Sequence, residues 1–339
     1  MKGKHLKIWG VKVMKEDVII VGAGPCGLSA AIELQKKGIK PLLIEKGNVA
    51  ESIYRYPTHQ TFFSSSDRLE IGGYPFITEK QKPVRNEALT YYRTVAQRSH
   101  LRIHSYEKVI GVEKIHDYFV VSTQKRTGED QTYQAKFVII ATGYYDHPNM
   151  LNVPGEELDK VSHYFKEAHP YFDKDVVVIG GKNSAVDATL ELVKAGARVT
   201  VIYRGSKYSD SIKPWILPQF DSLVQKEIVQ MEFNARVTKI TDDHVHYVKG
   251  GEEKIIVNDF VFAMTGYHPD HSFLEKMGVD IDSETGRPFY NEETMETNVE
   301  GIYIAGVIAA GNNNNEIFIE NGRFHGDLIA SSICKKLKK

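Results

Sequence analysis

Three glycines, Gly22, Gly24 and Gly27, lie between an apolar β-branched run and a helical pattern. This spacing is typical of a dinucleotide site: the first glycine permits a tight turn, the second lets backbone approach a pyrophosphate, and the third lets helix pack on strand. The helix N-terminus then offers N–H groups to the phosphates. Glu45 ends the next strand, where a carboxylate can accept hydrogen bonds from ribose hydroxyls.

A second glycine turn departs from this pattern. Gly180 and Gly181 are present, but Lys182 takes the place of the middle glycine, so its side chain must point away or contact a phosphate. The next strand ends in Arg204 rather than an acid, which suits the 2′-phosphate of NADP, and Lys207 is a second candidate for that contact. An ordinary solvated arginine is the alternative. The pattern predicts NADPH here, and two dinucleotide sites on one chain suggest FAD in the first.

The chain has two cysteines, Cys26 and Cys334, which form neither a disulfide framework nor a zinc set. No cluster of its histidines has metal-ligand spacing, so we predict no metal. Cys26 falls in the first turn of the first helix, where the dipole favours a thiolate. It can equally be a small packing residue beside the pyrophosphate.

The elements that position these residues are two β-α-β units, Asp17–Glu45 and Asp175–Arg204. Each has a buried strand, a glycine turn, a helix with apolar residues at helical spacing, and a second strand. The helices are expected to end at Gly38 and Gly196, where a left-handed cap is expected.

Two similar apolar strands that end in Thr-Gly flank the second unit, at Phe137–Gly143 and Phe260–Gly266. This arrangement indicates that the second domain is inserted into the first. We predict an α/β fold of two Rossmann-like domains. The FAD domain would comprise residues 14–150 and 268–339, the NADPH domain residues 151–267, and residues 1–13 would be an N-terminal extension. A final strand at Gly301–Ala305 and a helix near residues 322–335 would complete the FAD domain.

Composition narrows the possible partners. The chain has 339 residues and a net charge of −1, which gives no indication of a nucleic-acid surface. No stretch approaches the ~20 apolar residues of a membrane span, and the N-terminus does not read as a signal peptide. With so few cysteines, we expect a cytoplasmic protein without a membrane partner.

The order of these motifs resembles low-molecular-weight thioredoxin reductases over about residues 14–335, but the Cys-x-x-Cys dithiol of those enzymes is missing. The chain more closely resembles the bacillithiol disulfide reductase family. The segments that carry this resemblance are GPCGL at 24–28, YPTHQTFFSSSDRLEIG at 56–72, GGKNSAVDA at 180–188, SIKPWILP at 211–218 and NEIFIENGRFHG at 315–326.

The resemblance implies an NADPH- and FAD-dependent enzyme that reduces the disulfide of bacillithiol, a small-molecule thiol, and that forms a homo-oligomer, a dimer or tetramer. It implies that Cys26 is a nucleophile that attacks the disulfide and forms a mixed disulfide, which reduced flavin resolves. His59 and Thr61 could reach polar atoms of the flavin, or be polar loop residues without such contact. The other positions expected to contact FAD are Pro25, Lys46, Val109, Thr142, Gly143 and Gly306, and those expected to contact NADPH are Asn183 and Ser184.

Three other functions stay open. A flavin monooxygenase is one, because Phe165–His169 loosely resembles a linker of that family, although without its usual glycine. A ferredoxin–NADP reductase shares the fold without the dithiol. A non-catalytic flavoprotein that senses NADPH is the third.

Overall fold

The computed structural model describes residues 14–313 and 315–338, so the predicted extension at residues 1–13 lies outside the described residues. The chain forms two compact units. Within the described residues, the first comprises 14–55, 60–147 and 268–338, and the second comprises 56–59 and 148–267.

The first unit is built on a sheet of order β3-β2-β1-β6-β5-β4, with β15 paired to β6. The strands β1, β2, β3, β6 and β15 pair in parallel, whereas β4 and β5 add an antiparallel hairpin. Its strands are β1 (Met14–Val21), β2 (Leu42–Glu45), β3 (Arg102–Ser105), β4 (Glu107–Ile115), β5 (Tyr118–Lys125), β6 (Asp130–Ile140) and β15 (Ile302–Ile304).

The long strand β6 joins the two parts of this sheet. Its first half pairs with β5, and Val138–Ile140 pair with Ile302–Ile304 of β15. Because β1 pairs along its other edge, the carboxyl ends of β1, β6 and β15 meet at one edge of the sheet. Ligands of open parallel sheets bind at this edge.

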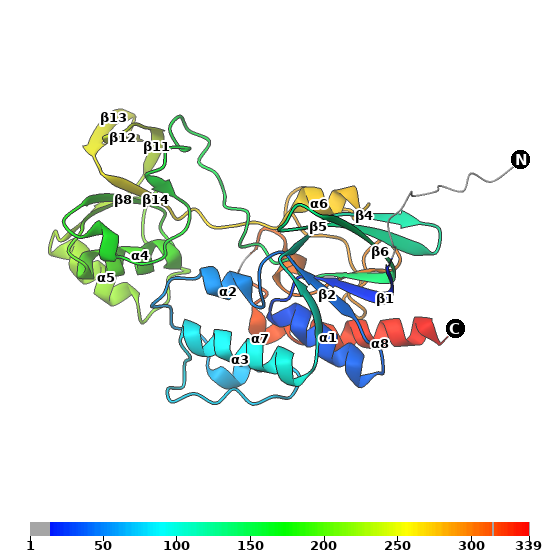
Figure 1. The fold of residues 1–339 in the computed structure, drawn as a ribbon. Helices are drawn as coiled ribbons and strands as arrows, with labels where there is room; N and C mark the ends of the chain where they lie inside the picture. The colour runs from blue at the N-terminus through cyan, green and yellow to red at the C-terminus, as the bar shows by residue number, and fades with distance from the viewer. Residues whose placement is uncertain (1–13, 314, 339) are drawn as a thin grey trace, which may run out of the picture. The chain divides into compact units, whose positions relative to one another are not determined.

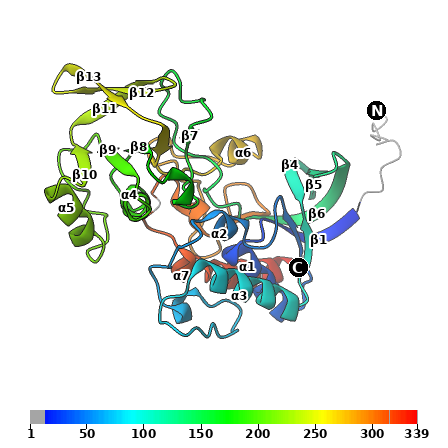
Figure 2. The same ribbon diagram turned by 60° about the vertical axis from the view of Figure 1, so that its left-hand side comes forward.

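Helices cover the sheet of the first unit. The helix α1 (Pro25–Lys36) lies beside α8 (His325–Leu337) in both views (Figure 1, Figure 2). Gly326 makes this approach close, because a Cβ there would lie 2.7 Å from Cα of Ala30. The other helical segments of this unit are α2 (Glu51–Arg55), η1 (Ser66–Leu69), α3 (Arg85–Arg98), α6 (His271–Lys276), η3 (Val307–Ala310) and α7 (Ile319–Gly322).

The second unit has a parallel sheet of order β10-β9-β8-β14-β7. Its central strands are mostly apolar, as expected for a sheet that is covered on both faces. The strands are β7 (Val161–Ser162), β8 (Asp175–Ile179), β9 (Arg198–Ile202), β10 (Val229–Glu232) and β14 (Phe260–Ala263), and the helical segments are η2 (His169–Tyr171), α4 (Asn183–Lys194) and α5 (Leu217–Gln225).

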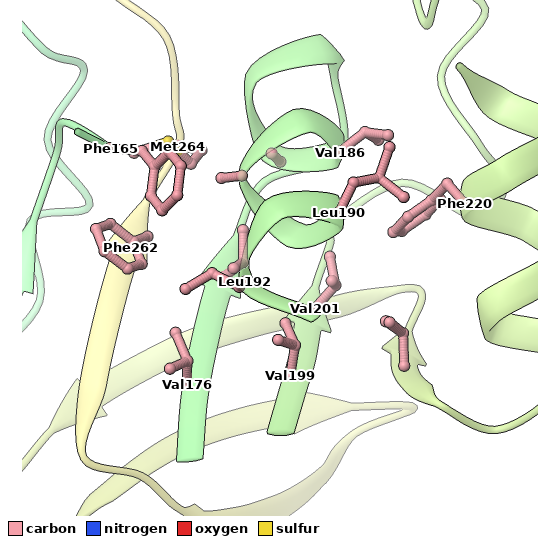
Figure 3. Close-up of a cluster of buried hydrophobic side chains, with 14 of the residues drawn as sticks. Phe165, Val176, Val186, Leu190, Leu192, Val199, Val201, Phe220, Phe262 and Met264 are labelled. Atoms are coloured by element: carbon pink, nitrogen blue, oxygen red, sulfur yellow. The ribbon is translucent and has the colours of Figure 1, made fainter. Parts of the chain in front are cut away.

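One face of this sheet packs against α4 (Figure 3). Val186 and Leu190 of α4 contact a core that includes Val176, Val201 and Phe220, all of them buried. The other face packs on an antiparallel sheet of β11 (Ala235–Ile240), β12 (His244–Lys249) and β13 (Glu252–Val257), through a second apolar cluster that includes Val177, Ile202 and Val245.

The fold confirms the predicted α/β class with two Rossmann-like units, and the predicted glycine caps hold. Gly38 and Gly196 have φ angles of +83° and +86°, in the left-handed region. The chain passes between the units after Arg55, His59, His147 and Tyr267. The short segment 56–59, which the sequence had placed with the first unit, therefore belongs to the second.

Candidate functional site

The turn between β1 and α1 has the backbone shape that its glycines predict. Gly22 has φ of +105°, and a Cβ there would lie 2.5 Å from the carbonyl oxygen of Ala141. A side chain at Gly27 would collide with the carbonyl oxygen of Gly22, so this glycine lets the helix start close to the strand. Gly24 is the extended N-cap residue, and Pro25 follows as the first helical residue, where its missing N–H costs nothing.

The edge of the sheet around this turn fits a bound pyrophosphate. A Cβ at Gly24 or at Gly143 would meet no atom within 4 Å, so both backbones face open space. Between them, the buried hydroxyl of Thr142 has no hydrogen-bond partner in the described part of the chain. A buried hydroxyl without a partner is costly, so a ligand at this edge would satisfy it. These residues therefore fit the FAD diphosphate predicted from the sequence.

Glu45 is buried at the end of β2 and already binds backbone. Its two carboxylate oxygens accept the N–H groups of Ala23 and Gly47, each at 2.8 Å. Burial raises the pKa of this carboxyl, although the two amides act in the opposite direction. Each oxygen keeps a further lone pair for a ribose hydroxyl. Lys46, in contrast, turns to Asp146, with Nζ 2.5 Å from Oδ2.

The structure separates His59 from Thr61. His59 belongs to the second unit, where its ring lies 6.0 Å from that of Phe165, whereas Thr61 pairs with Val84 in the first. The neighbouring Thr58 N–H donates to the carbonyl of Lys166 at 2.9 Å, which anchors the segment to the second unit. The contacts of His59 and Thr61 with the flavin stay predictions.

Cys26 lies between two glycines that come from the far end of the chain. Its Sγ is 2.9 Å from a Cβ placed on Gly306 and 3.0 Å from one placed on Gly322, so a side chain at either position would crowd the sulfur. Burial raises the pKa of the Cys26 thiol to about 12, and the charge of Glu320 adds to this rise. Burial and the Glu320 charge thus act against the thiolate, in the direction opposite to the helix dipole.

Glu320, whose charge acts on this thiol, forms a hydrogen bond within the first unit. The hydroxyl of Ser64 donates to Glu320, in a short hydrogen bond. Arg323 donates to the carbonyl oxygens of Asp67 and Glu70 at 2.9 and 2.6 Å, which fixes the turn after α7. The sequence assigned no role to these residues, because their proximity to Cys26 depends on contacts across some 300 positions of the chain.

Val109 and Gly306 complete the predicted flavin contacts. Val109 is 8% exposed and lies at an irregularity in the pairing of β4 with β5. Gly306 follows β15 at the same edge of the sheet as Thr142, since Ala305 N–H donates to Ile140 at 2.9 Å. Both residues belong to the first unit, as do Thr142 and Gly143.

The second glycine turn is also tightly packed. A Cβ at Gly180 would lie 2.5 Å from the carbonyl oxygen of Met264, and Gly181 lies against the ring of Tyr203. Lys182 is the extended N-cap residue of α4 and is exposed, so its side chain is accessible to a ligand. Its contact with a phosphate stays a prediction.

The side chains after this turn hold a neighbouring loop. The Asn183 amide donates to the carbonyl of Ser211 and accepts the Lys213 N–H, both at 2.9 Å. Ser184 is exposed in the first turn of α4, where a hydroxyl can meet a phosphate. The loop is thus fixed beside the helix N-terminus.

Arg204 and Lys207 are the basic residues at the end of β9. Arg204 is exposed, and Lys207 Nζ lies 3.3 Å from Asp210 in an exposed pair of low stability. Both cations are therefore accessible to a 2′-phosphate.

Two further features were considered in the sequence, a metal site and a membrane-spanning helix. Among residues 14–313 and 315–338, no group of three or more His, Cys, Asp or Glu side chains could hold a metal ion. In the same residues, no helix has the length and apolar character needed to cross a membrane.

Comparison with known proteins places the chain among flavin-dependent reductases. A family model described as pyridine nucleotide-disulphide oxidoreductase matches residues 19–306. The bacilliredoxin reductase Bdr of Bacillus subtilis (strain 168) is 65% identical over 96% of this chain and 99% of its own length. The solved structure of bacillithiol disulfide reductase Bdr (YpdA) from Bacillus cereus is 66% identical, with a TM-score of 0.94, and covers 95% of this chain and 100% of that one. Its counterpart from Staphylococcus aureus is 59% identical, with a TM-score of 0.92, and covers 96% and 99%.

Proposed function

Because the chain belongs to the pyridine nucleotide-disulphide oxidoreductase family, we propose that it reduces the disulfide of bacillithiol with electrons from NADPH. The protein is an oxidoreductase that uses FAD and NADPH. The balanced reaction consumes one NADPH, one proton and one disulfide, and it releases NADP⁺ and two thiols. FAD, when bound, accepts the electron pair from NADPH and passes it on.

The observation that carries this proposal is the edge of the first sheet. The open backbone at Gly24 and Gly143 and the unpartnered Thr142 hydroxyl fit a diphosphate, and the Cys26 thiol lies beside Gly306 at the same edge. A dinucleotide and a thiol are therefore brought together in one unit. This favours a disulfide acceptor over the monooxygenase, ferredoxin reductase and non-catalytic alternatives.

If Cys26 is the nucleophile that attacks the disulfide, a base must accept the proton of its thiol. The resting thiol is protonated, because its pKa is raised to about 12. Glu320 is the carboxylate whose charge acts on this thiol, so it is our candidate to accept the proton as the sulfur attacks. The attack forms a bond from Sγ to one sulfur of the disulfide and releases the other half as a thiolate, which takes a proton.

In the second unit, we assign Gly180, Gly181, Lys182, Asn183 and Ser184 to the NADPH diphosphate, and Arg204 and Lys207 to its 2′-phosphate. The exposed position of both cations supports this assignment. We further propose a cytoplasmic homo-oligomer, because NADPH-dependent thiol reduction belongs to a reducing compartment.

The test is NADPH consumption with bacillithiol disulfide, measured for the wild type, Cys26→Ala and, as a matched control, Cys334→Ala. We expect the wild type and the Cys334 variant to turn over and the Cys26 variant to lose activity by at least about 100-fold. If all three are equally active, the reductase stands but Cys26 only packs beside the flavin. If the wild type ignores this disulfide and reduces an oxidised bacilliredoxin, the substrate proposal fails in favour of a protein disulfide.

A further inference from the structure

His325, the first residue of α8, binds the backbone at the edge of the first sheet. The Gly306 N–H donates to its Nδ1 at 3.2 Å. Gly306 has φ of +81° and starts the turn Gly306–Gly311, which contains η3. The turn therefore depends on a hydrogen bond to a side chain 19 positions further along the chain.

This hydrogen bond fixes the protonation of the imidazole. An N–H donor requires a lone pair on Nδ1, so the bonded ring is neutral with its proton on Nε2. A protonated ring would turn an N–H toward the N–H of Gly306, and the bond would break. The contact exists only while His325 is neutral.

The surroundings of His325 favour the neutral ring. The residue is largely removed from solvent, and burial lowers its pKa. The positive end of α8 acts in the same direction. Burial is the cause of this lowering, and no charged group among the described residues adds to it.

The turn that His325 holds is the one that packs on Cys26. Gly306 is the glycine beside Sγ, and it follows the strand that pairs with β6 near Thr142. The turn Gly306–Gly311 has no acidic or other polar side chain. Any polar contact that it makes with the flavin therefore uses its backbone, which makes its shape important.

We propose that neutral His325 is a positioning residue that holds the Gly306 amide, and with it the flavin-binding turn, in place. This inference rests on the proposed flavin site at the edge of the first sheet. It follows that flavin affinity is full where His325 is neutral and falls as the pH drops through the pKa of His325. Asparagine can replace the function without titrating, because its Oδ1 occupies the place of Nδ1.

The experiment measures the FAD dissociation constant of the purified full-length chain between pH 5.5 and 8.5, from the flavin fluorescence and the visible spectrum. The variants are His325→Asn and His325→Leu. His100→Asn, an identical change at an exposed histidine, is the control. Thermal unfolding and far-UV circular dichroism of each variant show whether it is folded.

At pH 8.5, we expect His325→Asn to bind FAD within about threefold of the wild type, and His325→Leu to bind it about 10- to 100-fold more weakly, as for a buried N–H that loses its acceptor. Toward pH 5.5, affinity should fall in the wild type and in His100→Asn but stay level in His325→Asn.

Equal affinity of the wild type and a folded His325→Leu variant would overturn the inference, as would equal pH profiles of the wild type and His325→Asn. If the leucine variant does not fold, the comparison of the pH profiles decides alone. A wild type that takes up no FAD at any pH contradicts the proposed function instead, so the two failures are distinguishable.

Discussion

Asp187 is a single carboxyl whose environment should make the stability of the second unit depend on pH. It lies on α4, and burial, with a contribution from the charge of Glu191, raises its pKa to about 6 from the ordinary 3.8. The folded state therefore favours the protonated acid. Its stabilisation is complete below about pH 4 and is lost as the pH rises through 6.

We expect Asp187→Asn to stabilise the protein at pH 8 by about 1–3 kcal/mol and to have little effect at pH 4, because the amide removes the buried charge. Urea unfolding at both values of pH measures this. The control is Asp159→Asn, which removes an exposed carboxylate of the same unit. An equal gain for Asp187→Asn at pH 4 and pH 8 would contradict the role of burial.

Arg204 should set the choice between NADPH and NADH. Loss of a charge-assisted contact to the 2′-phosphate weakens binding about 10- to 100-fold, whereas NADH lacks that group. We expect Arg204→Leu to raise the KM for NADPH by this factor and to change the KM for NADH less than about threefold. Arg236→Leu, at another exposed arginine of the second unit, is the matched control. Parallel loss with both cofactors would show that Arg204 is structural.

Single residues also show where sequence reasoning reaches its limit. The roles of Gly22 and Gly27 followed from their spacing in the strand-turn-helix pattern, and Gly27 acts on the carbonyl of Gly22, only five positions before it. The state of Cys26 did not follow, since its burial depends on Gly306 and Gly322, which only the fold brings near. A helix dipole is a local effect that sequence reveals, whereas desolvation by distant segments is not.

Among the elements, α1 and α8 come from opposite ends of the chain and pack closely at Gly326. A Cβ on Gly326 would lie 2.7 Å from Cα and 2.8 Å from N of Ala30. We expect Gly326→Val to destabilise the first unit by about 1–3 kcal/mol or more, because backbone atoms cannot move aside as a flexible side chain can. The midpoint of urea unfolding, followed by flavin release, reports on this unit.

The control for that change is Lys335→Val, which places the same β-branched residue at an exposed position of α8. It introduces the same side chain without the steric conflict, and its helix propensity falls, whereas that of Gly326→Val rises, so propensity alone would make Lys335→Val the less stable of the two. If the two variants unfold at the same urea concentration, close packing of α8 on α1 is not the cause of the effect.

The β-α-β units were predictable because all of their sequence signals lie within about 30 residues. These signals are an apolar strand, a glycine turn, apolar residues at helical spacing and a left-handed cap. The assignment of segment 56–59 to the second unit was not predictable, because nothing in its sequence indicates that it contacts Phe165 and Lys166. The sequence predicted a strand at Gly301–Ala305 but not its pairing with β6, which lies more than 160 positions earlier in the chain.

For the molecule as a whole, the second unit has its own core and one nearly continuous chain. Its apolar clusters on both faces of the parallel sheet draw only on residues between 151 and 264. We therefore expect a chain of residues 148–267 to fold alone, with a cooperative thermal transition, and to bind NADP⁺ but not FAD. Calorimetry with each nucleotide measures this. A chain that stays unfolded would show that segment 56–59 or the first unit is required.

The discontinuity of the first unit sets an order of events on the ribosome. Its sheet needs β15 and its helical layer needs α8, which ends at Leu337, whereas the second unit is complete in sequence at Tyr267. At ~5–20 residues per second, the intervening stretch of 337 − 267 = 70 residues takes roughly 4–14 s to synthesise. During that interval the edge of β6 and the apolar face of α1 await partners that have not yet been made. The nascent chain thus matures from its middle outward, and its first-made segment is the one that depends longest on chaperones.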